Sequence, residues 1–220
     1  MKTLSAMVRP VLIVGLSLLL SGCIGAMQTQ AHEPVGTATL KPTQEDKDAG
    51  LVGLASGFNL KDYQVVVVRQ FKVTEPELND EEDRKLAAEM PPFFQAELVR
   101  RLRESGLFAK VINASEREYA PGSEKALVLE GEITRLAPGS RALRYLVGFG
   151  AGRTKAQTEM HFVDPQAGSV VLVTADRRAA AYGVFGGDSR DHLRESFDDM
   201  ARDLGKFLGR LSRGEAPKTQ

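Results

Sequence analysis

The 220-residue chain contains one cysteine, no tryptophan and three histidines, and its 29 Lys+Arg residues equal its 29 Asp+Glu residues. One cysteine cannot form an intrachain disulfide, which excludes a disulfide-rich scaffold. A net charge of zero argues against a broad nucleic-acid-binding surface. The 42% apolar content is close to the globular average and excludes whole-chain disorder, and the length fits one domain.

Residues that could carry catalysis are sparse. His32 lies in a polar N-terminal stretch, His161 lies on the polar face of an expected strand, and His192 lies in the first turn of an expected helix. No two of them have metal-ligand spacing, and nucleophile-elbow, zinc-protease and P-loop motifs are missing from the sequence. Glu130 and Glu132 share one strand face, where solvation at the surface is the simpler reading. The sequence predicts no enzyme, no catalytic residues, no metal site and no cofactor.

The longest apolar run near the N-terminus is too short for a transmembrane helix. Val11–Leu20 is ten residues long, whereas a bilayer-spanning helix needs about 20. The run follows the basic residues Lys2 and Arg9, and this order is typical of an export signal. An exported protein is therefore expected.

The residues Leu20-Ser21-Gly22-Cys23 follow this run and resemble a bacterial lipobox. In that motif two small residues precede a cysteine whose thiol receives diacylglycerol. The alternative is an ordinary secretory signal with a chance cysteine. We expect lipidation at Cys23, because this is the only cysteine and two or three acyl chains hold a protein stably on a membrane. By resemblance to Gram-negative lipoproteins, Ile24 after the cysteine, in place of Asp, favours transfer to the outer membrane, facing the periplasm.

Composition divides the chain into four parts. Residues 1–22 are expected to be a lipoprotein signal peptide, and residues 23–50 the lipidated cysteine with a flexible polar tether. Residues 51–213 are expected to form one domain, followed by a disordered C-terminal tail over residues 214–220.

Periodicity within the domain predicts two helices and five strands in the order β-α-β-β-β-β-α. Four consecutive valines in Tyr63–Phe71 indicate a central strand buried on both faces. A first helix begins after Asn79 or Asp80, is expected to kink or restart at Pro91-Pro92, and ends at Gly106. Further strands are expected at 109–113, 126–136, 155–163 and 169–182, and a last helix follows Asp188, with an apolar stripe over 193–211. Such an order predicts the α+β class, with a mixed, mostly antiparallel sheet and two main helices packed on it.

The most unusual segment is PGSRALRYLVGFGAGRTK, residues 138–155. Its glycines alternate and are flanked by basic residues. Three readings remain open: glycines that permit a tight turn and close packing, a protein-contact surface, or a site for an anionic small molecule or lipid head group. The candidate contact residues are Arg141, Arg144, Tyr145, Gly148, Phe149, Gly150, Gly152 and Arg153.

This segment also carries a resemblance. The string GSRALRYLVGFGAG, after LVLEGEIT and before a strand ending in VDPQAG, resembles a bacterial lipoprotein family described only as a domain of unknown function. The resemblance spans Tyr63 to Leu211 and implies no catalytic residues. More loosely, the topology is similar to small periplasmic lipoprotein domains such as the curli secretion lipoprotein and the activators of penicillin-binding proteins.

These observations predict a lipid-anchored envelope protein that acts as an assembly or accessory factor through protein contact. The expected partners are the membrane, through the N-terminal lipid, and other envelope proteins, with a homo-oligomer as a further option and no nucleic acid. The alternative function is a binding module for an anionic small molecule or lipid head group at residues 138–155.

Overall fold

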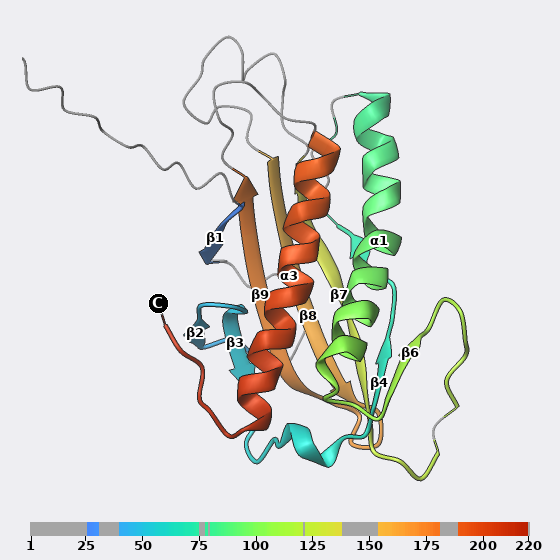
Figure 1. Ribbon diagram of the computed structural model, residues 1–220, viewed down its shortest axis with the longest axis vertical. Helices are drawn as coiled ribbons and strands as arrows, with labels where there is room; N and C mark the ends of the chain where they lie inside the picture. Colours follow the sequence, from blue (N-terminus) through green and yellow to red (C-terminus); the bar gives the residue numbers. More distant parts are fainter. Residues whose placement is uncertain are drawn as a thin grey trace, which may run out of the picture.

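Two long helices cover one face of a nine-stranded sheet in the computed structural model, which describes residues 26–30, 40–74, 78, 80–120, 122–137, 154–180 and 189–219 (Figure 1). The predicted α+β class and single domain are confirmed. The strands are β1 (Ala26–Gln30), β2 (Gln44–Asp46), β3 (Gly50–Leu54), β4 (Val65–Val68), β5 (Lys72–Val73), β6 (Lys110–Asn113), β7 (Ala126–Ala137), β8 (Thr154–Asp164) and β9 (Ser169–Ala180). The helices are the 3-10 turn η1 (Leu60–Asp62), α1 (Glu81–Ser105) and α3 (Ser189–Ser212).

The sheet has the spatial order β2-β3-β9-β8-β7-β4-β6, with β1 added to β9 and β5 added to β7. Strand β4 is parallel to β6 and β7, and β5 is parallel to β7. The pairs β1–β9, β2–β3, β3–β9, β7–β8 and β8–β9 are antiparallel. The sheet is thus mixed and mostly antiparallel, and β4-α1-β6-β7-β8-β9-α3 reproduces the predicted order of elements.

The four valines of β4 are all buried, as their unbroken apolar run predicts. Val66 and Val68 face the main core beneath the helices. Val65 and Val67 form a smaller cluster on the opposite face, where Tyr119 is among the residues packed against them. The central position of β4 between β6 and β7 explains why neither face of the strand carries polar side chains.

Helix α1 begins and ends where its capping residues indicate. The Asp80 side chain accepts a 2.9 Å hydrogen bond from the backbone N–H of Asp83, and Gly106 ends the helix in the left-handed region at φ 63°. The restart expected at Pro91-Pro92 is wrong, because α1 is one helix through both prolines. Met90 and Phe94, on either side of the prolines, are fully buried, so tertiary packing sustains a helix that local propensity would interrupt.

The main core lies between the sheet and the two helices. The ring of Phe94 on α1 lies 5.0 Å from that of Phe71 below it and 5.0 Å from that of Phe197 on α3, measured between centroids. The α3 residues at helical spacing are buried against this core: Leu193, Phe197, Met200, Leu204 and Phe207. The apolar stripe of the last helix therefore covers the domain's own sheet.

Parts of the expected flexible tether form strands of the sheet, and one residue of the expected disordered tail is hydrogen-bonded to the end of such a strand. Within 23–50, β1 pairs with β9 and β2 pairs with β3, and residues 31–39 lie outside the described residues. In the tail, the N–H of Lys218 donates to Asp46 at 2.9 Å, and its carbonyl accepts from the N–H of Lys47 at 2.8 Å. Edge pairing needs only backbone hydrogen bonds, so a polar, aperiodic sequence does not reveal it.

Candidate functional site

The residues that the sequence singles out for function lie outside the described residues. They are the lipidation candidate Cys23 and the contact candidates Arg141, Arg144, Tyr145, Gly148, Phe149, Gly150, Gly152 and Arg153. The structure does place both ends of the Gly/Arg-rich segment. The segment leaves the sheet at Ala137, the last residue of β7, and re-enters it at Thr154, the first residue of β8.

Two adjacent rows of paired residues connect these ends to the N-terminal strand. In one row Ala137 pairs with Lys155, Lys155 with Ala179 and Ala179 with Met27; in the next row Thr154 pairs with Ala180 and Ala180 with Ala26. The first row crosses the four neighbouring strands β7, β8, β9 and β1, so three interstrand spacings of ~4.8 Å, or roughly 15 Å, separate Ala137 from Met27. We call these two rows the anchor end of the sheet, because the lipidation candidate Cys23 precedes Ala26 by three residues in the sequence. In Figure 1 the arrowhead of β9 and the first turns of α1 and α3 also lie at the upper end of the molecule.

The outer face of the sheet, opposite the helices, carries the two carboxylates noted from the sequence. Glu130 accepts a 2.6 Å hydrogen bond from Arg69, and the side chains of this ion pair are 37% and 59% exposed. Glu159, on the same face of β8 as His161, is buried, and its Oε1 lies 2.7 Å from Nε2 of His161. In the β7–β8 register Glu130 lies opposite His161 and Glu132 lies opposite Glu159. These pairings give each polar group a structural neighbour on the face.

Two further properties concern the described residues as a whole. Nowhere in these ranges do three or more His, Cys, Asp or Glu residues come together in a group that could hold a metal ion. None of the helices in the same ranges combines the length and apolarity that crossing a membrane requires. His192, on α3, has its Nδ1 3.7 Å from Glu195 one turn further on.

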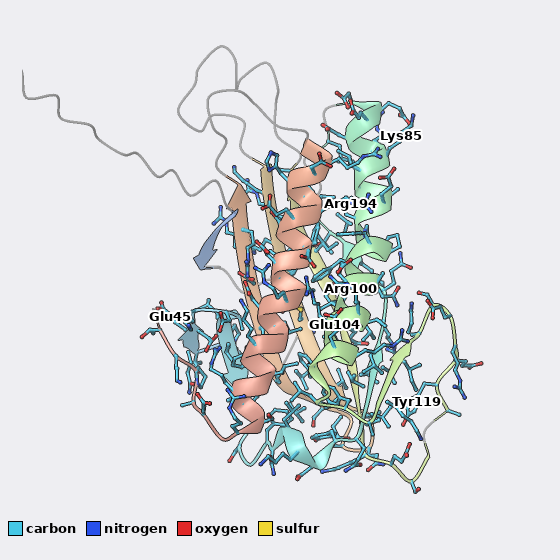
Figure 2. All side chains as sticks on the ribbon, in the orientation of Figure 1. Glu45, Lys85, Arg100, Glu104, Tyr119 and Arg194 are labelled. Atoms are coloured by element: carbon cyan, nitrogen blue, oxygen red, sulfur yellow. The ribbon has the colours of Figure 1, made fainter. Side chains whose placement is uncertain are left out.

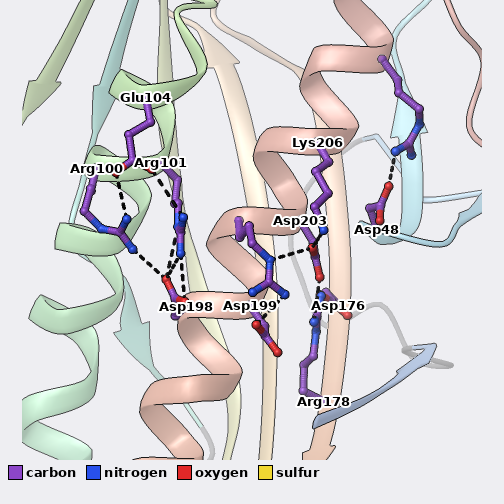
Figure 3. A network of polar contacts seen from close by, with 12 residues as sticks. Asp48, Arg100, Arg101, Glu104, Asp176, Arg178, Asp198, Asp199, Asp203 and Lys206 are labelled. Carbon is purple, nitrogen blue, oxygen red and sulfur yellow. Dashed lines mark hydrogen bonds and ion pairs between the residues drawn. The ribbon is translucent and has the colours of Figure 1, made fainter. Parts of the chain in front are cut away.

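The densest polar cluster is buried between β9 and α3 (Figure 3). Arg178 on β9, with a 3% exposed side chain, binds Asp176 on its own strand and Asp203 on α3, both at 2.9 Å. Lys206, one turn beyond on α3, lies 2.7 Å from Asp203. Arg202 also contacts Asp203, at 3.4 Å, and binds Asp199 of its own helix at 2.6 Å. Three acids and three bases thus form one network with no net charge, which ties the last strand to the last helix.

The two carboxyl groups that bind Arg178, those of Asp176 and Asp203, have pKa values shifted in opposite directions. Burial raises the pKa of Asp176 above its usual range, and the neighbouring Arg178 offsets only part of that effect. Burial acts in the same direction on Asp203, but hydrogen bonding from Lys206 and the charge of Arg178 outweigh it and lower the pKa of Asp203. Asp176 Oδ1 has no hydrogen-bond partner, so Asp176 depends on Arg178 for its stabilisation.

This network was not predicted from the sequence, although its residues follow a pattern there. Asp176 and Arg178 are separated by one residue in β9, so both lie on the helix-facing side of the strand, the face that also carries Leu172. Asp203 lies three residues after Met200 and so falls on the buried stripe of α3. Charged residues in register with two apolar faces indicate a buried ion pair once those faces are known to meet.

The two helices are also joined along their exposed sides. Arg101 on α1 binds both carboxylate oxygens of Asp198 on α3, at 2.7 and 3.0 Å. Nearer the start of each helix, the guanidinium of Arg194 on α3 lies 4.4 Å from the ring centroid of Phe93 on α1. Figure 2 labels Arg194, Arg100 and Glu104 along the two helices, and Arg100 also binds Asp198 of α3, at 2.9 Å. These contacts hold α1 and α3 side by side over the sheet.

A second buried carboxylate fastens the N-terminal hairpin to the C-terminal residues. Both oxygens of Asp46, whose side chain is fully buried, accept hydrogen bonds from Arg210 at 2.7 Å, and Arg210 also binds Asp48. Backbone N–H groups of Asp48 and Lys218 donate to the same carboxylate at 2.9 Å. Burial by itself would raise the pKa of Asp46, but hydrogen bonds from Arg210 and from these N–H groups hold it below its usual value.

Replacing Asp46 with asparagine is expected to lower the free energy of unfolding by about 2 kcal/mol at pH 7, since hydrogen bonds to charged groups contribute roughly 1.5–3 kcal/mol. The pKa of Asp46 is depressed in the folded state, so its contribution is present above the unfolded pKa of about 3.9 and is lost as pH falls below that value. Urea unfolding at pH 7 and pH 3 measures the difference.

The matched control is Asp62→Asn, which removes a carboxylate whose side chain is 49% exposed. We expect it to change stability by less than about 0.5 kcal/mol at either pH. If the difference in free energy of unfolding between the wild type and Asp46→Asn stays constant from pH 7 to pH 3, the hydrogen bonds from Arg210 do not depend on an ionised Asp46, which would contradict this prediction.

Comparison with solved structures gives distant likenesses. Two PelC dodecamer structures from Paraburkholderia phytofirmans match with TM-scores of 0.45 and 0.43 at 18% and 17% identity, over 73% and 70% of this chain and 96% and 95% of theirs. A DUF330 protein from Xanthomonas campestris matches with a TM-score of 0.45 at 9% identity, over 73% of this chain and 92% of its own. These TM-scores are below 0.5 and imply neither a shared function nor a shared assembly.

No curated protein matches the chain. A family model described as "Domain of unknown function (DUF4410)" does match, over residues 66–211. The match begins within β4 and ends within α3, so it contains the whole predicted order of elements and leaves out β1, β2 and β3. The expected membership of a family described only as a domain of unknown function is confirmed, and the chain belongs to the DUF4410 family.

Proposed function

We propose that this protein is a lipid-anchored lipoprotein of the bacterial envelope, held at the outer membrane and facing the periplasm. The observation that carries the proposal is the tetrapeptide Leu20-Ser21-Gly22-Cys23, placed directly after a ten-residue apolar run and containing the only cysteine of the chain. A thioether-linked diacylglycerol on Cys23 accounts for that cysteine, and the added acyl chains supply stable membrane attachment.

Replacing Cys23 with alanine tests the anchor. The variant is expected to lose all incorporation of a palmitate analogue in growing cells and to leave the membrane fraction, because no other thiol can take the lipid. Ser21→Ala is the matched control, since it keeps a small residue in the tetrapeptide and should still be labelled. Label uptake and membrane retention by Cys23→Ala would exclude the lipoprotein proposal.

We propose that the protein acts by contact with other envelope proteins, as an assembly or accessory factor without enzymatic activity. Support comes from residue types in the Gly/Arg-rich segment 138–155, where Tyr145 and Phe149 lie between Arg144 and Arg153. Aromatic residues and arginine dominate the energetics of protein interfaces. The residues that flank the segment, Ala137 and Thr154, both lie at the end of the sheet where β1 begins, which supports a partner position close to the proposed anchor.

Arg144→Ala and Phe149→Ala are expected to leave the melting temperature nearly unchanged and to abolish in-cell crosslinking of the tagged full-length protein. The physical reason is that interface side chains truncated to alanine lose partner contacts without opening a cavity in the core. Mass spectrometry of the crosslinked products identifies the partner, and a second copy of this chain would appear as a dimer band. Unfolding of Phe149→Ala would instead assign Phe149 to the core and the segment to a structural turn.

A further inference from the structure

The N-terminal strand shortens the connection between the anchor and the domain. From Cys23 to Ala26, the first residue of β1, there are three residues, which reach at most roughly 11 Å when fully extended. The flexible tether expected from the sequence, 27 residues long, could extend to roughly 90 Å. Because Ala26 to Gln30 pair with Ala180 to Asp176 of β9, the chain from Cys23 enters the sheet almost at once.

This short connection attaches at a defined place. Ala26 pairs with Ala180 in the row next to the one that contains Lys155 and Ala137, so it belongs to the anchor end of the sheet. The opposite end of β8 is the turn after Asp164, nine residues along the strand from Lys155, or roughly 30 Å away. A connection of roughly 11 Å therefore holds one end of the sheet near the bilayer surface and leaves the other end far from it.

We propose that the anchor end of the sheet, the two adjacent rows that contain Ala26, Ala180, Lys155 and Ala137, lies against the phospholipid head groups, so that the domain stands on the membrane in one orientation. The proposal rests on the proposed lipidation of Cys23. It goes beyond it, because a lipoprotein on a long free tether would have no fixed orientation. The pairing of β1 with β9 makes the difference.

Energy transfer to the bilayer surface measures this orientation. Full-length protein, processed in cells, is purified with one added cysteine, either Lys155→Cys at the anchor end or Gln166→Cys at the far turn. Gln166 is exposed and its N–H donates to Asp164 at 2.8 Å, which fixes its position. A dye on the added thiol donates to acceptor lipids in phosphatidylethanolamine–phosphatidylglycerol vesicles, while a lipidated Cys23 cannot react with it. We expect several-fold higher transfer from position 155 than from position 166.

A pair of variants tests the role of β1. Gln28→Pro with Thr29→Pro removes at least one hydrogen bond to β9, because alternate N–H groups of an antiparallel strand point to the partner and proline has none. Gln28→Ala with Thr29→Ala keeps both N–H groups and is the control. The difference in transfer between the two dye positions is expected to collapse in the proline pair and to persist in the alanine pair.

The possible results distinguish failure of the proposed orientation from failure of the proposed lipidation of Cys23. Protein that carries no lipid and does not float with vesicles overturns the lipoprotein proposal and this orientation together. Lipidated, vesicle-bound protein with equal transfer from both positions overturns the orientation alone, as does a proline pair that behaves like the wild type. A difference that appears in native membranes but not in pure lipid vesicles would assign the orientation to a protein partner and overturn contact with lipid.

Discussion

Replacing Arg178 with methionine is expected to lower the free energy of unfolding by about 3–5 kcal/mol, the usual consequence of removing one partner from a buried ion pair. Arg178 is the only group that the described residues place between Asp176 and Asp203, at 2.9 Å from each. Methionine fills similar volume but leaves Asp176, 1% exposed, without a counter-charge. Chemical denaturation of the purified protein at pH 7 measures the loss.

The control for Arg178 is Arg69→Met, on the outer face of the same sheet. Arg69 also pairs with a carboxylate, Glu130, but its side chain is 59% exposed, so we expect a loss below about 1 kcal/mol. Replacing Asp176 with asparagine and Arg178 with methionine together should recover part of the stability, because the unpaired buried charge is then removed. Equal losses from Arg178→Met and Arg69→Met would show that burial does not determine the strength of the network.

Gly131→Val is expected to destabilise the domain by about 3 kcal/mol or more, at or above the upper end of the range for overpacked cores. Gly131 lies in β7 opposite Met160, where the backbone of β8 passes very close. A Cβ atom at this position would lie 2.1 Å from the carbonyl oxygen of Glu159 and 2.8 Å from the ring of Phe71. The carbonyl cannot yield without separating β7 from β8, so the melting temperature should fall steeply.

Gly205→Ala is the matched control for the glycine substitution. Gly205 lies within α3, and a Cβ there would meet no atom within 4 Å. Alanine in a helix is favoured over glycine by about 0.5–1 kcal/mol, so this variant is expected to raise the melting temperature. If Gly131→Val melts at the wild-type temperature, the close approach of β7 and β8 at Gly131 does not constrain the sheet.

Several elements of the fold follow from local patterns. The four valines of β4, the cap at Asp80 and the left-handed Gly106 each involve contacts within a few residues of sequence or an unbroken run of one residue type. Alternation in β8 likewise places Met160 and Phe162 in the core. Such features are predictable because the side chains that decide them are neighbours in the chain.

The candidate site was predictable only in part. The lipobox-like tetrapeptide that ends at Cys23 and the Gly/Arg-rich segment are visible as strings of residues, and they lie outside the described residues. The relation between the strands that follow or flank them was not visible, since it depends on the register that pairs Ala26 with Ala180 and Ala137 with Lys155. The structure therefore adds that Ala26, three residues after Cys23, and Ala137 and Thr154, which flank the segment, lie at the same end of one sheet.

Hydrophobic periodicity and helix caps are sufficient to predict the α+β class, the order of the main elements and both long helices. Periodicity shows which face of each element avoids water, and the caps show where a helix begins and ends. Tertiary structure alone decides the edge pairing of β1 and β2, the burial of Arg178 between two acids, and the clamp of Asp46 by Arg210, 164 residues away. Backbone pairing carries no side-chain pattern, and a charged residue shows its partner only when two distant segments meet. The orientation that we propose on the membrane depends on the first of these, the pairing of β1 with β9.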